Sequence, residues 1–319
     1  PHSDTVLYNA DGLGYGLFPA STDILELWDD LENVAKGSEL LNLYENMLEQ
    51  NGVKPGVYLD TLEQLARSVE NQLLLGQILG QIRTIYWKLL NDSNRLLVAS
   101  ELEATLWERM KAEGKPAKKK AIFNTYRNIV MTDGGIQKVY RVWKKDMEIE
   151  GLNFSENDYI SLAEELAVKL PDQSSEITLA QMQRIDNHDR KRRFEFILPS
   201  LSSDPKVRDK FFESLKMQEN RQTESWVLSA LGYLHHPLRT DHSVAYILPS
   251  LKLLQEIQVT GDIFFPKGWL DVTLANHSSD RAVQTVRAFL DERPDYNEQL
   301  KMKILQAADM IFQANEIKK

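Results

Sequence analysis

Four consecutive cations give this sequence its clearest potential for binding chemistry. They follow Asn187-His-Asp189 and precede Phe194, and they are Arg190, Lys191, Arg192 and Arg193. Four successive side chains on a helix cover all its sides, so at least one cation must face the interior or a groove. Burying it there is costly unless an anion or a carboxylate lies beside it. Two alternatives follow: the cluster binds an anionic ligand group, or it pairs with carboxylates on the same helix surface, namely Asp186, Asp189 and Glu195.

The histidines do not form a zinc-hydrolase motif. Such a site uses His-Glu-x-x-His, in which two imidazoles one helical turn apart reach the metal and the Glu acts as base. None of the six His in this sequence is followed by Glu. His235, His236 and His242 lie close together, but adjacent His point in different directions and Pro237 ends the helix between them, so we predict a solvated loop.

Other nucleophiles and cofactor motifs are also missing. The sequence contains no Cys, no Gly-x-Ser-x-Gly turn and no P-loop, and Gly12, Gly14 and Gly16 do not have the spacing of a dinucleotide-binding loop. We therefore predict no catalytic residue, no metal ligand and no cofactor within this chain.

A basic run starting at Lys115 is interleaved with aromatic residues. It continues through Lys118, Lys119 and Lys120, and Phe123 and neighbouring aromatics follow at helical spacing. A single-strand nucleic-acid binder would have this pattern, but such aromatics more often pack inward while the Lys head groups remain in water. We expect the second arrangement, because the net charge of -9 argues against general nucleic-acid binding.

The first 20 residues read as a β-hairpin. Val6 to Tyr8 predicts one strand, Asp11-Gly12 predicts the tight turn, and Leu13 to Phe18 predicts the returning strand. A lone hairpin is marginally stable in water, so we expect it to belong to a sheet outside this chain. This and the start at Pro1-His2 lead us to expect a fragment of a longer polypeptide.

Everything after the hairpin is predicted to be helical. Apolar residues recur at helical spacing. Asp204, Ser155 and either Ser278 or Ser279 are expected N-caps, and Lys36-Gly37 and Gly114 are among the expected stops. We predict a helical bundle over 21–152 and a helical-repeat array over 153–319. The fold class is thus all-α, a right-handed array of HEAT- or armadillo-like helix pairs preceded by the hairpin over 1–20.

A short repeat supports the array in the second half. Ile197-Leu-Pro-Ser-Leu201 recurs as Ile247-Leu-Pro-Ser-Leu251, and each copy is expected to close or kink a helix at its Pro. No segment approaches the length of uninterrupted apolar residues that a membrane span requires, so we predict none.

Two segments resemble the aminopeptidase N family of gluzincin zinc metallopeptidases. Asn9 to Gly16, followed by a helix near Ser21, resembles the entry to that family's C-terminal helical domain, although the family often has an aromatic residue and an Arg at Gly16-Leu17. Tyr58 to Ala66 followed by Val69-Glu-Asn resembles its helix pairs. The resemblance implies that zinc and the catalytic groups lie on an upstream domain, and that this chain caps the catalytic cleft and controls peptide access.

The resemblance also implies partners and a binding role. The partners would be the upstream catalytic and β-domains of the same polypeptide and peptide substrates, with no nucleic acid and no membrane span. A comparable Arg-rich segment in the family can receive the peptide's C-terminal carboxylate. Here it falls on Arg190 and Arg192, or one residue later on Lys191 and Arg193. The alternative function is a free-standing helical-repeat interaction scaffold.

Overall fold

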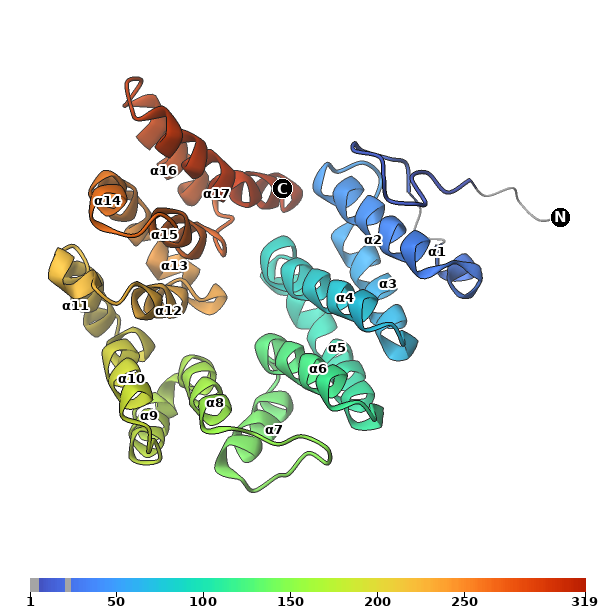
Figure 1. The fold of residues 1–319 in the computed structure, drawn as a ribbon, viewed down its shortest axis with the longest axis horizontal. Helices are drawn as coiled ribbons and strands as arrows, with labels where there is room; N and C mark the ends of the chain where they lie inside the picture. The colour runs from blue at the N-terminus through green and yellow to red at the C-terminus, as the bar shows by residue number, and fades with distance from the viewer. Residues whose placement is uncertain (1–5, 21–23) are drawn as a thin grey trace. The chain divides into compact units, whose positions relative to one another are not determined.

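The structure is all-helical over the residues that it describes. This computed structural model describes residues 6–20 and 24–319, and no strand occurs within them. The predicted all-α class is therefore confirmed. The chain forms two units: the first contains residues 1–135 and 147–152 with Lys318, and the second contains 136–146 and 153–317 with Lys319. Figure 1 shows the helices in chain order.

The first unit is built from helices that pack in two rows. Helices α2, α4 and α6 contact one another in that order, α3 contacts α5, and the two rows pack together through pairs that follow one another in the chain. The elements are α1 (Ile24–Leu27), the 3-10 turn η1 (Trp28–Asp30), α2 (Asn33–Leu48), α3 (Pro55–Ser68), α4 (Gln72–Thr84), the π-helical turn η2 (Ile85–Leu89), α5 (Asp92–Ala112) and α6 (Pro116–Ile129). Helix α7 (Asp133–Lys144) begins in the first unit and continues into the second.

The second unit follows the same principle. Helices α8, α10, α12, α15 and α17 contact one another in that order, whereas α9, α11, α14 and α16 pack against members of that row. The elements are α8 (Glu156–Lys169), η3 (Pro171–Gln173), α9 (Ser174–Gln183), α10 (His188–Leu201), α11 (Pro205–Ser214), η4 (Gln218–Arg221), α12 (Glu224–Leu234), η5 (Pro237–Arg239), α13 (Thr240–Ser243), η6 (Val244–Tyr246), α14 (Ile247–Thr260), α15 (Phe265–Leu274), α16 (Asp280–Asp291) and α17 (Glu298–Ile317). A continuous apolar core that includes Leu231, Ile247, Trp269 and Ile304 lies between the rows.

Local capping chemistry explains where several helices begin. The Ser155 side chain accepts a hydrogen bond from Asp158 N, while Asp158 accepts from Ser155 N, which completes a capping box at α8. Asp204 accepts from Lys206 N ahead of Pro205, and Ser279 accepts from Ala282 N at α16. The predicted N-caps Ser155 and Asp204 are confirmed, and of the two candidates Ser278 and Ser279 it is Ser279 that caps α16.

The predicted N-terminal β-hairpin does not form. Residues 6–20 contain a turn in which Gly12 N donates to Asn9 O, and both Asn9 and Gly12 have positive φ angles, but no strand follows. The Asn9 side chain accepts from Gly14 N and donates to Gly14 O, so it satisfies backbone groups that a strand partner would have satisfied. Asp11-Gly12 therefore predicts the turn and not the strands.

The N-terminal segment, residues 6–18, is held instead by polar side chains of α2. Ser38 Oγ donates to Asn9 O over 2.5 Å, Asn42 Nδ2 donates to Tyr8 O over 3.0 Å, and Asn46 Nδ2 donates to Phe18 O over 2.6 Å. These three α2 residues are buried. Helix α2 passes through Gly37, so the predicted stop at Lys36-Gly37 is wrong, whereas the stop at Gly114 is confirmed between α5 and α6. The predicted helix start near Ser21 lies outside the described residues.

The two copies of the Ile-Leu-Pro-Ser-Leu repeat occupy opposite ends of helices. Pro199 lies in the last turn of α10, as predicted, but the copy from Ile247 to Leu251 begins α14. Proline is tolerated in a first turn because its missing N–H would have had no helical partner there. The prediction that both copies close or kink a helix is therefore wrong for the second. Among the described helices, none has the length and apolar character needed to cross a membrane.

Candidate functional site

The predicted cationic cluster lies in the first two turns of α10. The Asn187 side chain accepts hydrogen bonds from the backbone N–H groups of Asp189 and Arg190, each over 3.0 Å, and so fixes the start of the helix. The four cations then project in different directions around α10. Each must be described by its own partner.

Arg190 pairs with a carboxylate of α8. Its Nη1 lies 3.0 Å from Glu156 Oε1, while Glu156 Oε2 accepts from Asp186 N over 2.9 Å. The hydrogen bond from Asp186 N and then that from Arg190 lower the pKa of Glu156. Both side chains of the pair retain contact with solvent, so the pair contributes little to stability.

Arg192 is the most exposed arginine of the cluster. Its Nη2 lies 2.5 Å from Asp189 Oδ1, one helical turn earlier, and 69% of the Arg192 side chain is exposed. This is a same-helix ion pair of the predicted kind. Among the described ion pairs of Arg190, Arg192 and Arg193, it is the only one that uses a carboxylate from the predicted set Asp186, Asp189 and Glu195. Lys191 is partly exposed.

Arg193 faces the interior, as the helical geometry requires of at least one cation. Its Nη1 lies 2.6 Å from Glu164 Oε1 of α8, and only 2% of the Glu164 side chain is exposed. Tyr233 of α12 donates its hydroxyl to Glu164 Oε2 over 2.6 Å. Burial first, and then the Glu164 carboxylate, raise the pKa of Tyr233 well above its ordinary value. Arg193, Glu164 and Tyr233 therefore join three helices through one buried carboxylate.

The geometry divides the predicted site residues into two groups. Arg193 is already paired with the buried carboxylate of Glu164. If Arg193 turned away to bind a ligand, Glu164 would be left as a buried charge without its cation. Arg190 and Arg192 pair with partners that remain partly exposed, so an incoming anion can compete for them at low cost. Sequence reasoning missed Glu164 and Tyr233. The only signal for Glu164 is a charged residue at a position where the α8 pattern requires an apolar one.

The three neighbouring histidines have three separate partners. His235 Nδ1 lies 2.8 Å from His277 Nε2, His236 Nε2 lies 3.5 Å from Glu165 Oε1, and His242 Nε2 lies 2.7 Å from Asp209 Oδ1. His235 and His236 are buried, so the predicted solvated loop is wrong there. Helix α12 ends at Leu234, and the 3-10 turn that follows keeps both imidazoles inside the unit. No group of three or more possible metal ligands occurs within residues 6–20 and 24–319.

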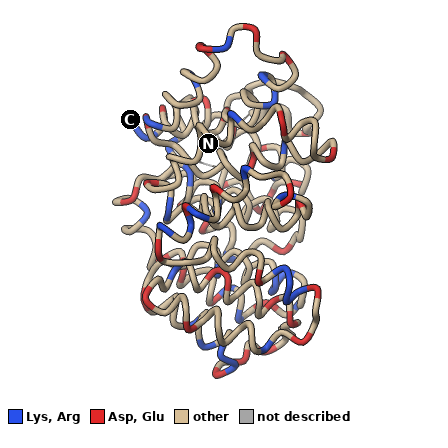
Figure 2. Tube along the Cα trace, turned by 90° about the vertical axis from the view of Figure 1, so that its left-hand side faces the viewer, with Lys and Arg blue, Asp and Glu red and all other residues tan. Residues whose placement is uncertain are grey.

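Two lysines of the predicted basic run, Lys118 and Lys119, are internal, whereas Lys115 is exposed and Lys120 is partly exposed. Lys118 is 1% exposed and Lys119 is buried with its Nζ donating to Glu150 O over 2.7 Å, so the prediction that their head groups remain in water is wrong. Phe123 and Tyr126 are buried, as is Trp143. Buried aromatic rings cannot stack on nucleic-acid bases. Figure 2 shows Lys and Arg interspersed with Asp and Glu along the chain.

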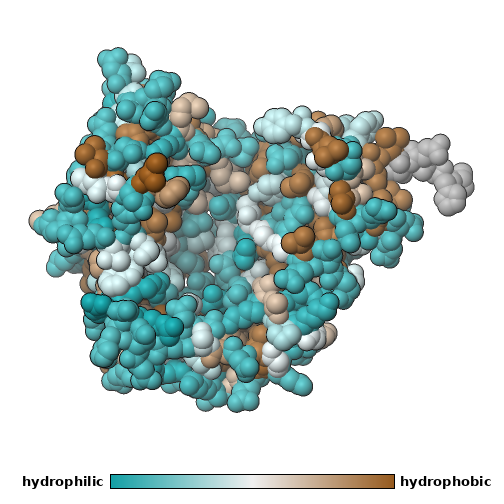
Figure 3. All heavy atoms as spheres, viewed as in Figure 1, coloured by the Kyte–Doolittle hydropathy of each residue, from teal (hydrophilic) through white to brown (hydrophobic). Residues whose placement is uncertain are grey.

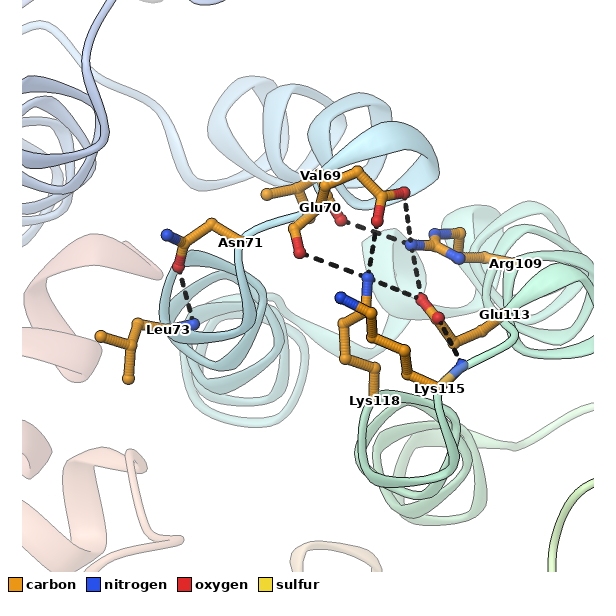
Figure 4. A network of polar contacts seen from close by, with 8 residues as sticks. All are labelled: Val69, Glu70, Asn71, Leu73, Arg109, Glu113, Lys115 and Lys118. Carbon is orange, nitrogen blue, oxygen red and sulfur yellow. Dashed lines mark hydrogen bonds and ion pairs between the residues drawn. The ribbon is translucent and has the colours of Figure 1, made fainter.

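Lys118 belongs to a charge network that joins three elements of the first unit (Figure 4). Its Nζ lies 2.8 Å from Glu70 Oε2 and 3.0 Å from Glu113 Oε2, and Arg109 Nη2 lies 2.9 Å from the same Glu113 oxygen. Burial alone would raise the pKa of Glu113, but the hydrogen bond from Lys115 N and the two cations lower it to about 2. The network therefore holds the loop between α3 and α4 against α5 and α6.

Comparisons with known proteins give no family for this chain. No family model matches the sequence, and no curated protein matches it.

Proposed function

We propose that this chain is the C-terminal helical domain of a zinc aminopeptidase of the aminopeptidase N family. In this proposal it carries no catalytic group, caps the catalytic cleft of the upstream domain and limits which peptides reach the zinc. The zinc belongs to that upstream domain. The proposal rests on the sequence resemblance and on the N-terminal segment.

The observation that carries the proposal is the apolar surface of the N-terminal segment. Leu13 is 85% exposed and Tyr15 is 107% exposed, and Val6, Tyr8 and Leu17 are exposed as well. Figure 3 shows hydrophobic residues gathered at the upper right, where Figure 1 draws this segment. Several exposed apolar side chains within one short segment are consistent with a surface that another polypeptide covers.

The way this segment is held adds to the argument. Buried polar side chains of α2 bind its carbonyl groups, so the backbone is ordered while the apolar side chains remain turned to solvent. An ordered apolar segment of this kind suits permanent contact with a neighbouring domain, because little conformational entropy remains to be lost on docking. We assign that contact to the upstream β-domain.

The order of helix packing supports the array part of the proposal. In the second unit each helix contacts helices near to it in the chain, in two rows, which is the arrangement of helix pairs in HEAT and armadillo repeats. We propose that residues 153–319 form such an array. Arg190 and Arg192, whose carboxylate partners are partly exposed, favour the register in which these two residues receive the peptide carboxylate.

The coding sequence upstream of Pro1 provides the first test. We expect it to contain His-Glu-x-x-His on a helix with a further Glu ligand, because two imidazoles and a carboxylate are needed to hold a catalytic zinc. We also expect the isolated chain to hold no stoichiometric zinc and to hydrolyse no aminoacyl-fluorogenic substrate. An upstream sequence without the motif, or turnover by the isolated chain with one zinc bound, would overturn the proposal.

A second experiment tests the apolar segment. In the intact parent enzyme, Leu13→Ser with Tyr15→Ser should lower the midpoint of thermal unfolding, since the β-domain would lose its apolar contact. Leu73→Ser is the control, because Leu73 is an exposed Leu of α4 outside the segment. Equal effects of the two variants would favour the free-standing scaffold, in which the segment contacts no domain of the same polypeptide.

The carboxylate role has its own test in the parent enzyme. Arg192→Ala should weaken binding of peptides with a free C-terminal carboxylate by roughly tenfold or more, since a charge-assisted hydrogen bond contributes about 1.5 to 3 kcal/mol. Amidated peptides should bind the variant and the unaltered enzyme alike. Equal losses for free-acid and amidated peptides would show that Arg192 does not read the carboxylate.

A further inference from the structure

Two imidazoles contact each other directly in the interior of the second unit. His235 follows the last residue of α12, and His277 lies in the turn between α15 and α16. Their Nδ1 and Nε2 atoms are 2.8 Å apart, the ring planes are nearly perpendicular, and both side chains are buried. Neither outer nitrogen, His235 Nε2 or His277 Nδ1, has a hydrogen-bond partner among the described residues.

The contact requires at least one neutral ring. With both rings neutral, one of the two contacting nitrogens, His235 Nδ1 and His277 Nε2, carries the N–H and donates it to the other. Of the two outer nitrogens, one then carries an N–H and the other a lone pair. A proton added to either ring leaves two outer N–H groups without acceptors. A proton on both rings places two donors 2.8 Å apart with like charges.

The contact joins a turn to a helix end. Asn276 Nδ2 also donates to His235 O over 3.0 Å, so residues 275–279 reach α12 through two neighbouring side chains that both contact His235. On its other side the turn is bound by Asn315 of α17, which donates to Ser278 O. Loss of the imidazole contact therefore leaves a single described hydrogen bond between this turn and His235.

The charged groups on the surrounding elements do not compensate an imidazolium. Tyr246 of η6 presents its ring edge-on to His235 at 5.9 Å, and its hydroxyl donates to Asp209. Arg239 of η5 is itself a cation and donates to Tyr233 O of α12.

Carboxylates on the neighbouring elements already have a donor or a cation, and Asp271 of α15 pairs with Lys267. Asp280 of α16 accepts from Asn315, and Glu165 of α8 lies near His236 and near Lys169 at 3.2 Å. Burial, and then the proximity of His277, lower the pKa of His235 well below its ordinary value. Burial lowers the pKa of His277 to about 4.

We propose that the His235–His277 contact is an acid-sensitive link that holds the turn 275–279 against the end of α12, and that a proton taken up from solvent opens it. The open state exposes both imidazoles to water, where each can be charged and hydrated. The second unit thus carries a local conformational response to acid.

The sign and size of the response follow from linkage. Both folded pKa values lie below the ordinary value of about 6.5, so the closed turn is favoured above that pH and loses stability as pH falls toward about 4. For His277 alone, the opening constant at pH 5 is about 30-fold larger than above pH 8.

Hydrogen exchange of the full chain tests the link. The amides of 275–283, including His277 N, which donates to Leu274 O, should lose about 30-fold protection between pH 8 and pH 5 after correction for intrinsic exchange rates. The amides of α10 should not. Unchanged protection of 275–283, or an equal loss across the whole second unit, would overturn the proposal.

Two variants and a titration complete the experiment. His188→Gln, at the exposed start of α10, should retain the full response, whereas the double variant His235→Gln with His277→Gln should lose it. If the double variant does not fold, an NMR titration of the unaltered chain decides. An imidazole of His277 that titrates near 6.5 overturns the link, and one that stays neutral below pH 5 supports it.

Discussion

Replacing Arg193 by Met is expected to destabilise the second unit by about 2 to 3 kcal/mol. The substitution leaves Glu164, a buried carboxylate, with Tyr233 as its remaining described donor at 2.6 Å. Breaking a fully buried ion pair by removing one partner costs about 3 to 5 kcal/mol. We reduce that value because 27% of the Arg193 side chain is exposed and solvent screens part of the interaction.

The matched control is Arg192→Met, one position earlier in the same helix. Arg192 and Asp189 are both mostly exposed, so the loss should be about 0 to 1 kcal/mol. The assay is urea unfolding followed by circular dichroism together with hydrogen exchange of the α10 amides, which reports on the second unit by itself. The expected difference corresponds to roughly a 10- to 100-fold larger unfolding constant for the Arg193 variant.

A double variant separates lost packing from an uncompensated charge. Glu164→Gln in the Arg193→Met background removes the buried charge and should recover about 1 kcal/mol or more relative to additive effects. Equal losses for the Arg192 and Arg193 variants, or strict additivity of the double variant, would refute the reasoning that Arg193 stabilises α8 and α10 through Glu164.

Three further predictions concern the first unit. Lys118→Met should lower the free energy of unfolding in urea by about 1.5 to 3 kcal/mol, because Lys118 donates to Glu113 in the interior. The control Lys111→Met removes an exposed ion pair and should lower it by at most about 1 kcal/mol. Equal losses for the two variants would contradict the burial argument. Gly134→Ala should stabilise α7 by about 0.5 to 1 kcal/mol, because nothing lies near the added Cβ. Gly135→Ala should instead be destabilising, because its Cβ would lie 2.1 Å from the buried Glu103 Oε2 of α5. Thermal midpoints that shift in the same direction for both variants would contradict this prediction. Since the pKa of Glu113 falls from 4.5 to about 2 on folding, its contribution is present above pH 4.5 and is lost between pH 4.5 and about 2. Glu113→Gln should flatten stability in that window when unfolding is measured against pH, and an unchanged slope would contradict the assignment.

Features that depend on a few consecutive residues were predictable from the sequence. Ser155 and Asp158 form their capping box within one turn, and Asp11-Gly12 forms a turn, because the groups involved are neighbours in the chain. The strands expected beside that turn fail for a reason that lies elsewhere. Asn42 and Asn46 of α2 donate to carbonyl groups of the segment, and the sequence of residues 6–18 alone does not predict that these donors lie beside it.

The candidate site was predictable in its position and not in its partners. Helical geometry alone requires that one of four consecutive cations face inward, and Arg193 does so. Its partner Glu164 lies 29 residues away on another helix, so only tertiary packing determines the pair. The same limit explains Lys118, whose partner Glu70 is 48 residues away. A local pattern of charges does not distinguish a solvated Lys from one that meets a carboxylate across a helix interface.

The two-row packing has a consequence for how this chain acquires its structure. Helix pairs that contact one another, such as α2 with α4 or α15 with α17, are separated by one intervening helix, so ordering them closes loops of moderate length and the cost in chain entropy is limited. Proteins in which most contacts join elements near one another in the sequence fold faster than proteins dominated by distant contacts. A damaged helix then perturbs mainly the helices beside it, and the remaining pairs can keep their structure.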